Sequence, residues 1–263
     1  MRLIWRTHRS FAIFSMVFIT LLQFLILFLI TTFNVPAIIQ MLLDQFPENL
    51  KVYFSNNFFN TLTLDGAAAF GLNHPLVLTL LSIVAISVPV AHIPGEIETG
   101  TLELVLAHPF RRKALLSSLW SSGCLILLFI IIAALIGSIT AAAIYHHVAN
   151  LLLINLLKIG VNLWLLFVLV MSYTLLFAAY KPTGRRASNI ASVLTLVFYF
   201  LFFLSQLWED IKFTAHYNIF NYYEPQKLMF GNCNFYLDCT VLTGLIILCY
   251  LVSRRLFIRR DIP

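Results

Sequence analysis

Long apolar runs without charges alternate with short polar links along this chain. Six of these runs are long enough to cross a bilayer, because about 20 apolar residues in a helix span its ~30 Å hydrocarbon core. They lie near residues 11–33, 76–93, 116–143, 159–180, 187–207 and 235–252. Two longer segments, 34–75 and 208–234, follow the first and fifth runs. The pattern predicts an all-α membrane protein with a single transmembrane domain over residues 1–263.

Composition supports this prediction. The chain is 60% hydrophobic and 11% charged, whereas about 25% of the residues in an ordinary soluble domain are charged. The first run is too long for the ~7 to 15 apolar residues of a signal peptide, and no small-residue cleavage site follows it. We therefore expect an uncleaved first span.

The basic residues predict how the chain is oriented. Most of the 17 Lys and Arg residues fall on one side of the six spans, namely Arg2, Arg6, Arg9, Arg111, Arg112, Lys113, Lys181, Arg185, Arg186, Arg254, Arg255, Arg259 and Arg260. Such a bias marks the cytoplasmic side, so both termini are expected inside. Topology and contact with anionic lipid headgroups account for these clusters, and no nucleic-acid partner is expected.

The two segments predicted outside have different characters. Apolar residues near helical spacing in "AIIQMLLDQF", residues 37–46, predict a short helix that packs on the bundle or lies at the outer interface. Residues 208–234 are rich in Trp, Phe and Tyr, which is typical of chain at the headgroup level, although contact with a substrate is an alternative.

The sequence lacks the residues that several kinds of chemistry require. The nearest approach to a phosphate-binding loop, "GAAAFGLN" at 66–73, has Leu72 where the lysine should stand. The six spans have no central Asp or Glu of the kind that ion-coupled carriers often bury. A disulfide between Cys233 and Cys239 is left open, and no ligand spacing of zinc-site type is present. We expect no catalytic, cofactor-binding or metal-binding residues in this chain.

One polar link, "PGEIETGTLELVLAHPFRRK" at residues 94–113, interrupts the apolar pattern. Gly100 as N-cap, Glu103 at the third helical position and Pro109 as terminator predict a two-turn helix from about Thr101 to His108. Acidic residues at its start and a basic triplet after its end agree with the helix dipole. So short a helix is unstable in water by itself. It therefore docks either on its own bundle, as a connector, or on a partner.

This link resembles the E-x-x-x-G-T-L-E/D-x-L-L-x-x-P-x-x-R segment of ABC-2 type permeases, the membrane subunits of ATP-binding-cassette exporters. The matching positions are Glu96, Gly100, Thr101, Leu102, Glu103, Val105, Leu106, Pro109 and Arg112. In particular, the chain is similar to the smaller permeases that accompany nitrous-oxide reductase maturation, sodium efflux and peptide-antibiotic export.

The resemblance implies a six-helix ABC-2 bundle in the bacterial cytoplasmic (inner) membrane, with a coupling helix seated in a groove of a separate ATPase subunit. It also implies an amphipathic elbow helix over residues 2–10, pairing with a second copy or a similar permease, and ATP with Mg²⁺ bound in the ATPase subunit. The ATPase interface would then comprise Glu96, Glu98, Gly100, Thr101, Leu102, Glu103, Leu106, Pro109, Arg111 and Arg112.

A permease subunit that forms an export pathway is thus the function that the sequence favours. A stand-alone secondary carrier or channel, and a membrane scaffold that recruits a cytoplasmic partner, are the alternatives. Pathway walls of Phe, Leu, Ser and Thr would suit a lipid, a hydrophobic peptide or a drug-like molecule, so the substrate stays open.

Overall fold

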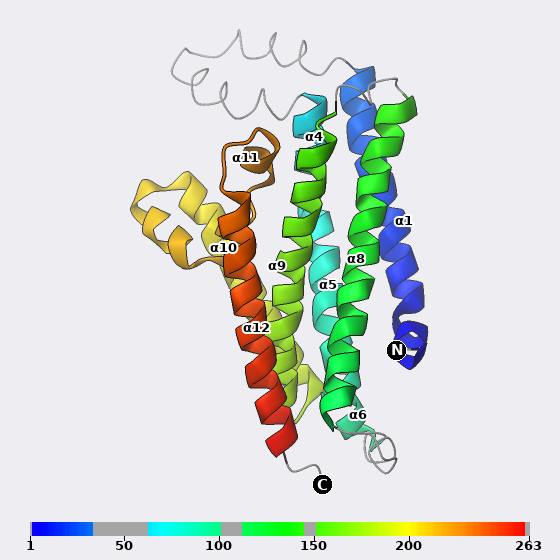
Figure 1. Ribbon diagram of the computed structural model, residues 1–263, viewed down its shortest axis with the longest axis vertical. Coiled ribbons are helices and arrows are strands. Elements are labelled where there is room, and N and C mark those ends of the chain that lie inside the picture. Colours follow the sequence, from blue (N-terminus) through cyan, green and yellow to red (C-terminus); the bar gives the residue numbers. More distant parts are fainter. Residues whose placement is uncertain (1, 34–62, 101–111, 145–150, 261–263) are drawn as a thin grey trace.

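The computed structural model describes residues 2–33, 63–100, 112–144 and 151–260, and in these ranges every regular element is a helix. Six long helices run side by side (Figure 1), each with a stretch long and apolar enough to cross a membrane. They are α1 (Arg2–Thr32), α5 (Pro75–His92), α8 (Arg112–Ile144), α9 (Leu153–Tyr180), α10 (Gly184–Leu207) and α12 (Phe235–Arg259). The predicted all-α bundle with six spans is confirmed.

Several helices are longer than the apolar runs that predicted them. α8 begins at Arg112, α9 begins at Leu153, and α12 continues to Arg259. A helix can extend past the hydrocarbon core because its backbone stays paired while Lys and Arg side chains reach the headgroups. The expected elbow helix is wrong as a separate element, because residues 2–10 are the first turns of the unbroken α1.

A short helix that the sequence did not predict, α4 (Leu64–Leu72), precedes α5. Thr63 caps it, since its Oγ1 accepts a hydrogen bond of 3.0 Å from Gly66 N. Small residues let it pack closely, and a Cβ added at Gly71 would overlap the Gln23 side chain of α1. The helix predicted over residues 37–46 lies outside the described residues.

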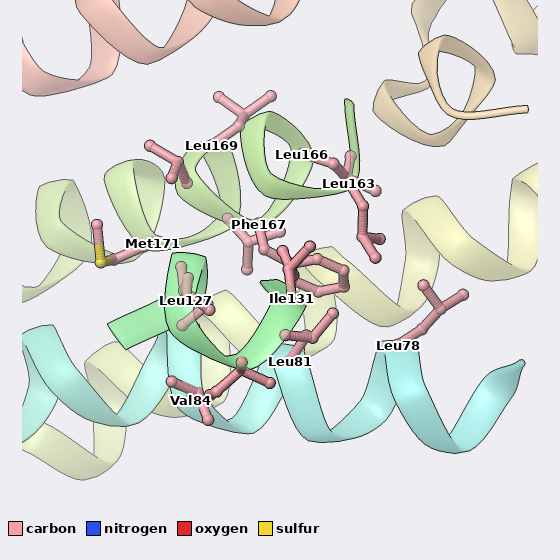
Figure 2. Close-up of a cluster of buried hydrophobic side chains, with 14 of the residues drawn as sticks. Leu78, Leu81, Val84, Leu127, Ile131, Leu163, Leu166, Phe167, Leu169 and Met171 are labelled. Carbon is pink, nitrogen blue, oxygen red and sulfur yellow. The ribbon is translucent and has the colours of Figure 1, made fainter. Parts of the chain in front are cut away.

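Helix α9 lies at the centre of the bundle and packs against α5, α8, α10 and α12. Figure 2 shows its Leu163, Phe167 and Met171 meeting apolar side chains of α5 and α8. Two indoles tie α8 to α9, because Trp120 Nε1 donates to Ser172 Oγ and Trp164 Nε1 donates to Cys124 O, both at 3.0 Å.

Helix α1 packs against α8 on the other side of the bundle. Thr20 Oγ1 donates to Ala133 O across this contact at 2.9 Å. A Cβ added at Gly137 of α8 would lie 2.6 Å from Thr20 O, so glycine is what allows the two backbones to approach.

The segment 208–234 folds into two 3-10 helices, η2 (Glu209–Tyr217) and η3 (Ile219–Tyr222), and the short α11 (Pro225–Met229). Its aromatic residues divide into two groups. Tyr217 is 84% exposed, as a headgroup-level residue would be, whereas Phe220 and Tyr223 are buried. Tyr223 Oη donates to Leu72 O of α4 at 3.2 Å, and burial raises the pKa of this phenol. Cys233 and Cys239, for which a disulfide was left open, are free thiols.

The two ends of the bundle are distinct in Figure 1. The start of α1 and the end of α12 lie toward the same end, where the short helix α6 (Pro94–Glu98) is also found. α4 and α11 lie at the other end. α6, the described first part of the link between α5 and α8, therefore lies at the end that carries both termini, as the distribution of Lys and Arg predicts.

Candidate coupling site and groove

The polar link begins with α6, which follows α5 after a single residue, Ile93. Pro94 suits the first turn of a helix because it has no amide hydrogen to leave unpaired. α6 ends where Gly100 N donates to Ile97 O at 3.1 Å, and Gly100 has a φ of 69°. That conformation belongs to a residue that terminates a helix, whereas an N-cap is extended. Gly100 therefore ends α6, and the prediction that it is the N-cap of a following helix is wrong.

Glu98 joins this link to the start of α10. Its Oε1 accepts a hydrogen bond of 3.0 Å from Gly184 N, although the two residues are 86 positions apart. Thr183, the N-cap residue of α10, makes no side-chain capping bond, so a carboxylate from another segment supplies the acceptor. A Cβ added at Gly184 would lie 3.3 Å from Val90 Cγ1, which shows how closely α10 approaches α5 here.

Glu96 joins α6 to α5 and, indirectly, to α1. Its Oε1 lies 2.9 Å from Nδ1 of His92, which is 8% exposed. The His92 ring meets the ring of His8 in α1 edge to face, with 5.2 Å between centroids. Within the described part of the chain, the buried Nε2 atoms of both histidines make no hydrogen bond. Three helices thus meet at the start of the polar link.

The far end of the link is also tied to the bundle. Arg112, the first residue of α8, donates from Nη1 to Arg260 O at 2.8 Å. Arg260 in turn donates to Ala178 O and Ala179 O at 3.2 and 3.1 Å, two carbonyls at the end of α9. A cation there complements the negative end of the helix dipole, and burial lowers the pKa of the Arg260 guanidinium.

Four of the residues predicted to contact an ATPase are therefore placed at one end of the bundle: Glu96, Glu98, Gly100 and Arg112. The other six lie outside the described residues: Thr101, Leu102, Glu103, Leu106, Pro109 and Arg111, as does the predicted helix from Thr101 to His108.

The sequence did not predict the partners of these residues, which are Gly184, His8, His92 and Arg260. A glycine that opens an apolar helix was the one available signal, and it does not identify Glu98 as the partner. The two histidines stand at the ends of apolar runs and look unremarkable in sequence.

A groove of about 400 Å³ runs between α5 and α10. α10 is the helix whose start is capped by Glu98. Hydroxyl and apolar side chains of both helices line the groove, together with Phe220 of η3. The ring of Phe220 contacts the ring of Tyr199 edge to face, with centroids 5.5 Å apart. The aromatic segment 208–234 thus contributes to a cavity wall as well as to the outer surface.

Comparison with known proteins identifies the family. The family model described as ABC-2 family transporter protein matches residues 6–230, which include most of α1, the helices from α4 to α11 and the polar link. No curated protein matches the chain significantly. The six membrane-spanning helices and this match agree: the chain belongs to the ABC-2 transporter family and is a multi-pass membrane permease of that type.

Proposed function

We propose that this chain is the permease subunit of an ABC exporter in the bacterial cytoplasmic membrane. A separate ATPase subunit binds and hydrolyses ATP with Mg²⁺, and residues 96–113 transmit its motion to the bundle. Two six-helix bundles, from two copies or from this chain and a similar permease, frame the pathway. The observation that carries the proposal is the hydrogen bond between Glu98 and Gly184, because it joins the polar link to a helix that lines the groove.

The contacts at the two ends of the link support a mechanical role. A displacement of residues 99–111 pulls on α10 through Glu98 and on α5 through the covalent continuity of α6. At the other end it reaches α9 and α12 through Arg112 and Arg260. Packed helices move as rigid bodies with few alternative arrangements, so a small shift at the link tilts whole helices. Such a device needs stiff connections and no catalytic side chain in this chain.

The groove between α5 and α10 is the proposed pathway surface. The two helices that line it are connected at one end. Glu98 of α6, which follows α5 after one residue, accepts the hydrogen bond from the start of α10, and Gly184 of α10 lies close to Val90 of α5. Tilting α10 against α5 would therefore widen or narrow the groove as the ATPase cycles.

Coexpression of the chain with its candidate ATPase tests the proposal. Changing Leu102 and Glu103 to lysine should abolish copurification of the ATPase and ATP-dependent transport in proteoliposomes. The control is Lys181→Glu, a charge reversal in the link between α9 and α10 on the same side, which should leave both intact.

Three outcomes would contradict parts of the proposal. Survival of copurification and transport in the Leu102 and Glu103 variant would refute the coupling role. Flux driven by an ion gradient without any ATPase would instead indicate a secondary carrier. Copurification of the ATPase without any transport would indicate a scaffold.

A further inference from the structure

A second cavity, which we call the outer pocket, lies where α4, the end of α10 and α11 meet. α4 and α11 lie at the end of the bundle opposite to both termini (Figure 1). The pocket is lined by Asn73 after α4, by Phe202 and Gln206 of α10, and by residues 223–227, 230 and 232 around α11. Its volume is about 240 Å³, below the ~300 to 1,000 Å³ of sites for drug-sized ligands, so it suits a smaller molecule. It shares no lining residue with the groove between α5 and α10.

Three side-chain amides of this lining are open to a ligand. Among the described residues, the side chains of Asn73, Gln206 and Asn232 make no hydrogen bond. Each carries an oxygen that accepts hydrogen bonds and an NH₂ group with two hydrogens to donate. A fourth amide, Gln226, is already fixed, because its Nε2 donates to Gly66 O of α4 at 3.0 Å and its Oε1 is buried. The three open amides therefore offer donors and acceptors together.

The two charged residues of the pocket neutralise each other. Lys227 Nζ lies 2.8 Å from both carboxylate oxygens of Glu224. A carboxylate has about four acceptor positions and an ammonium has three hydrogens, so both groups can still bind a ligand. A ligand anion would approach the charge of Glu224 as well as that of Lys227, and a ligand cation would meet the reverse problem. The ion pair therefore favours a neutral ligand with hydrogen-bonding groups.

Aromatic rings complete the pocket. Phe202 comes from α10, Phe230 follows α11, and Tyr223 is 2% exposed. The Tyr223 hydroxyl donates to Leu72 O at 3.2 Å, so its hydrogen is already used. Aromatic rings provide apolar surface for the carbon skeleton of a ligand. The pocket therefore suits a small ligand that has both an apolar face and a polar edge.

A ring that carries several hydroxyl groups meets these conditions. A hydroxyl donates one hydrogen bond and accepts two, and its hydrogen rotates to suit the partner. An anion could accept hydrogen bonds from the amide NH₂ groups, but the amide oxygens and Glu224 would then face it without a donor. A single sugar ring is neutral and combines hydroxyl groups with C–H surface.

The pocket is within reach of both water and lipid head groups. Trp208, two residues after Gln206, is 58% exposed, which is typical of a residue at the headgroup level. We propose that the outer pocket binds one neutral polyhydroxyl ring, either a free sugar or the head group of a glycolipid. This binding rests on the pocket alone and does not depend on the proposed function.

Equilibrium dialysis of soluble probes against the full chain tests the proposal. The chain is purified in a detergent without a sugar head group and placed in phosphatidylcholine nanodiscs, with empty nanodiscs subtracted and neither ATPase nor ATP present. The radiolabelled probes are methyl glucoside, methyl galactoside and the two corresponding methyl uronates, which are anionic. At least one neutral probe should bind saturably and at least about fivefold more tightly than its uronate, since one net hydrogen bond is worth roughly that factor.

A second arm distinguishes the two sources of the ring. Spin-labelled glucosyl and galactosyl diacylglycerols are placed in the same nanodiscs, and the fraction immobilised by the protein is compared with that of spin-labelled phosphatidylcholine. Saturable binding of a free glycoside without enrichment of the glycolipid identifies a dissolved sugar as the ligand. Enrichment of a glycolipid without binding of the free glycoside identifies a lipid head group. Either result, or both together, supports the proposal.

The double variant Gln206→Met and Asn232→Ala removes two of the open amides and should weaken binding at least about fivefold. Neither side chain makes a hydrogen bond within the described residues, so the bundle should stay folded. The matched control is Asn234→Ala, because Asn234 is also exposed, makes no side-chain capping bond and does not line the pocket. The control variant should bind as the unmodified chain does.

Failure of every neutral ring in both arms would overturn the proposal. Tighter binding of a uronate than of its neutral partner would also overturn it, because the pocket would then be an anion site served by Lys227. Unchanged binding by the double variant, or an equal loss in the Asn234 variant, would show that the amides of the pocket do not recognise the ring. All of these measurements are made without an ATPase, so a failure of the proposed function is recognised separately, as ring binding without ATPase association.

Discussion

Replacing Glu98 with alanine removes the carboxylate that accepts a hydrogen bond from Gly184 N at the start of α10. Loss of a side-chain acceptor at a helix N-terminus costs about 1 kcal/mol, and the negative charge near the positive end of the dipole contributes a similar amount at most. Because Glu98 is exposed, about 1 kcal/mol in total is the appropriate magnitude. That energy corresponds to about a fivefold change in the equilibrium constant between the attached and detached arrangements of α6 and α10.

Two further variants separate the charge of this contact from its position. Glu98→Gln keeps an acceptor oxygen without the charge, so we expect an intermediate effect. Adding Thr183→Asp to Glu98→Ala restores a capping carboxylate within α10 itself, because Thr183 is the N-cap residue and makes no side-chain capping bond. The double variant thus regains the cap without the connection between the polar link and α10.

The assay is the ratio of molecules transported to ATP hydrolysed in proteoliposomes that contain the permease and its ATPase, with thermal unfolding measured in parallel. Glu98→Ala should lower both the ratio, by up to about fivefold, and the unfolding temperature. Adding Thr183→Asp should restore the unfolding temperature and leave the ratio low. Recovery of both quantities would refute the reasoning, since Glu98 would then be a helix cap without a role in coupling.

Three other substitutions test contacts that hold the bundle together. Arg260→Ala should destabilise the protein by about 1 to 2 kcal/mol in thermal unfolding, because two carbonyls of α9 lose a charged donor, and Arg260→Lys should recover part of the loss. Gly137→Ala should cost about 1 to 3 kcal/mol because its Cβ would meet Thr20 O, whereas Gly244→Ala, with nothing within 4 Å, should be neutral or stabilising in the same measurement. Burial and the nearby carboxylates raise the pKa of the Cys233 thiol, so its alkylation by iodoacetamide, followed by mass spectrometry, should be slow at neutral pH and accelerate only at a pH above the ordinary thiol pKa. Fast alkylation at neutral pH would contradict that environment.

The number of spans and the family could be predicted from sequence because both depend on local features. Whether a run such as residues 11–33 can span a membrane depends only on its own length and the thickness of a bilayer. The family motif near Gly100 is likewise a contiguous stretch of sequence. Helix ends were less accurate, as at α9, because polar residues such as Lys158 are tolerated where a helix reaches the headgroups. Gly100 was assigned to the wrong helix terminus, since a glycine fits both ends and only its φ of 69° distinguishes them.

The sequence by itself therefore determined that this is a membrane bundle with six spans, which end carries the basic residues, and where a polar link interrupts the apolar pattern. Only the tertiary structure decided that Glu98 caps α10, that Arg260 holds the end of α9, and that α5 and α10 line a groove with hydroxyl and apolar side chains. The physical reason is that lipid-facing and buried sides of a membrane helix are both apolar, so hydrophobic periodicity does not reveal which side contacts which neighbour. Contacts between residues 86 positions apart depend on that choice of neighbours.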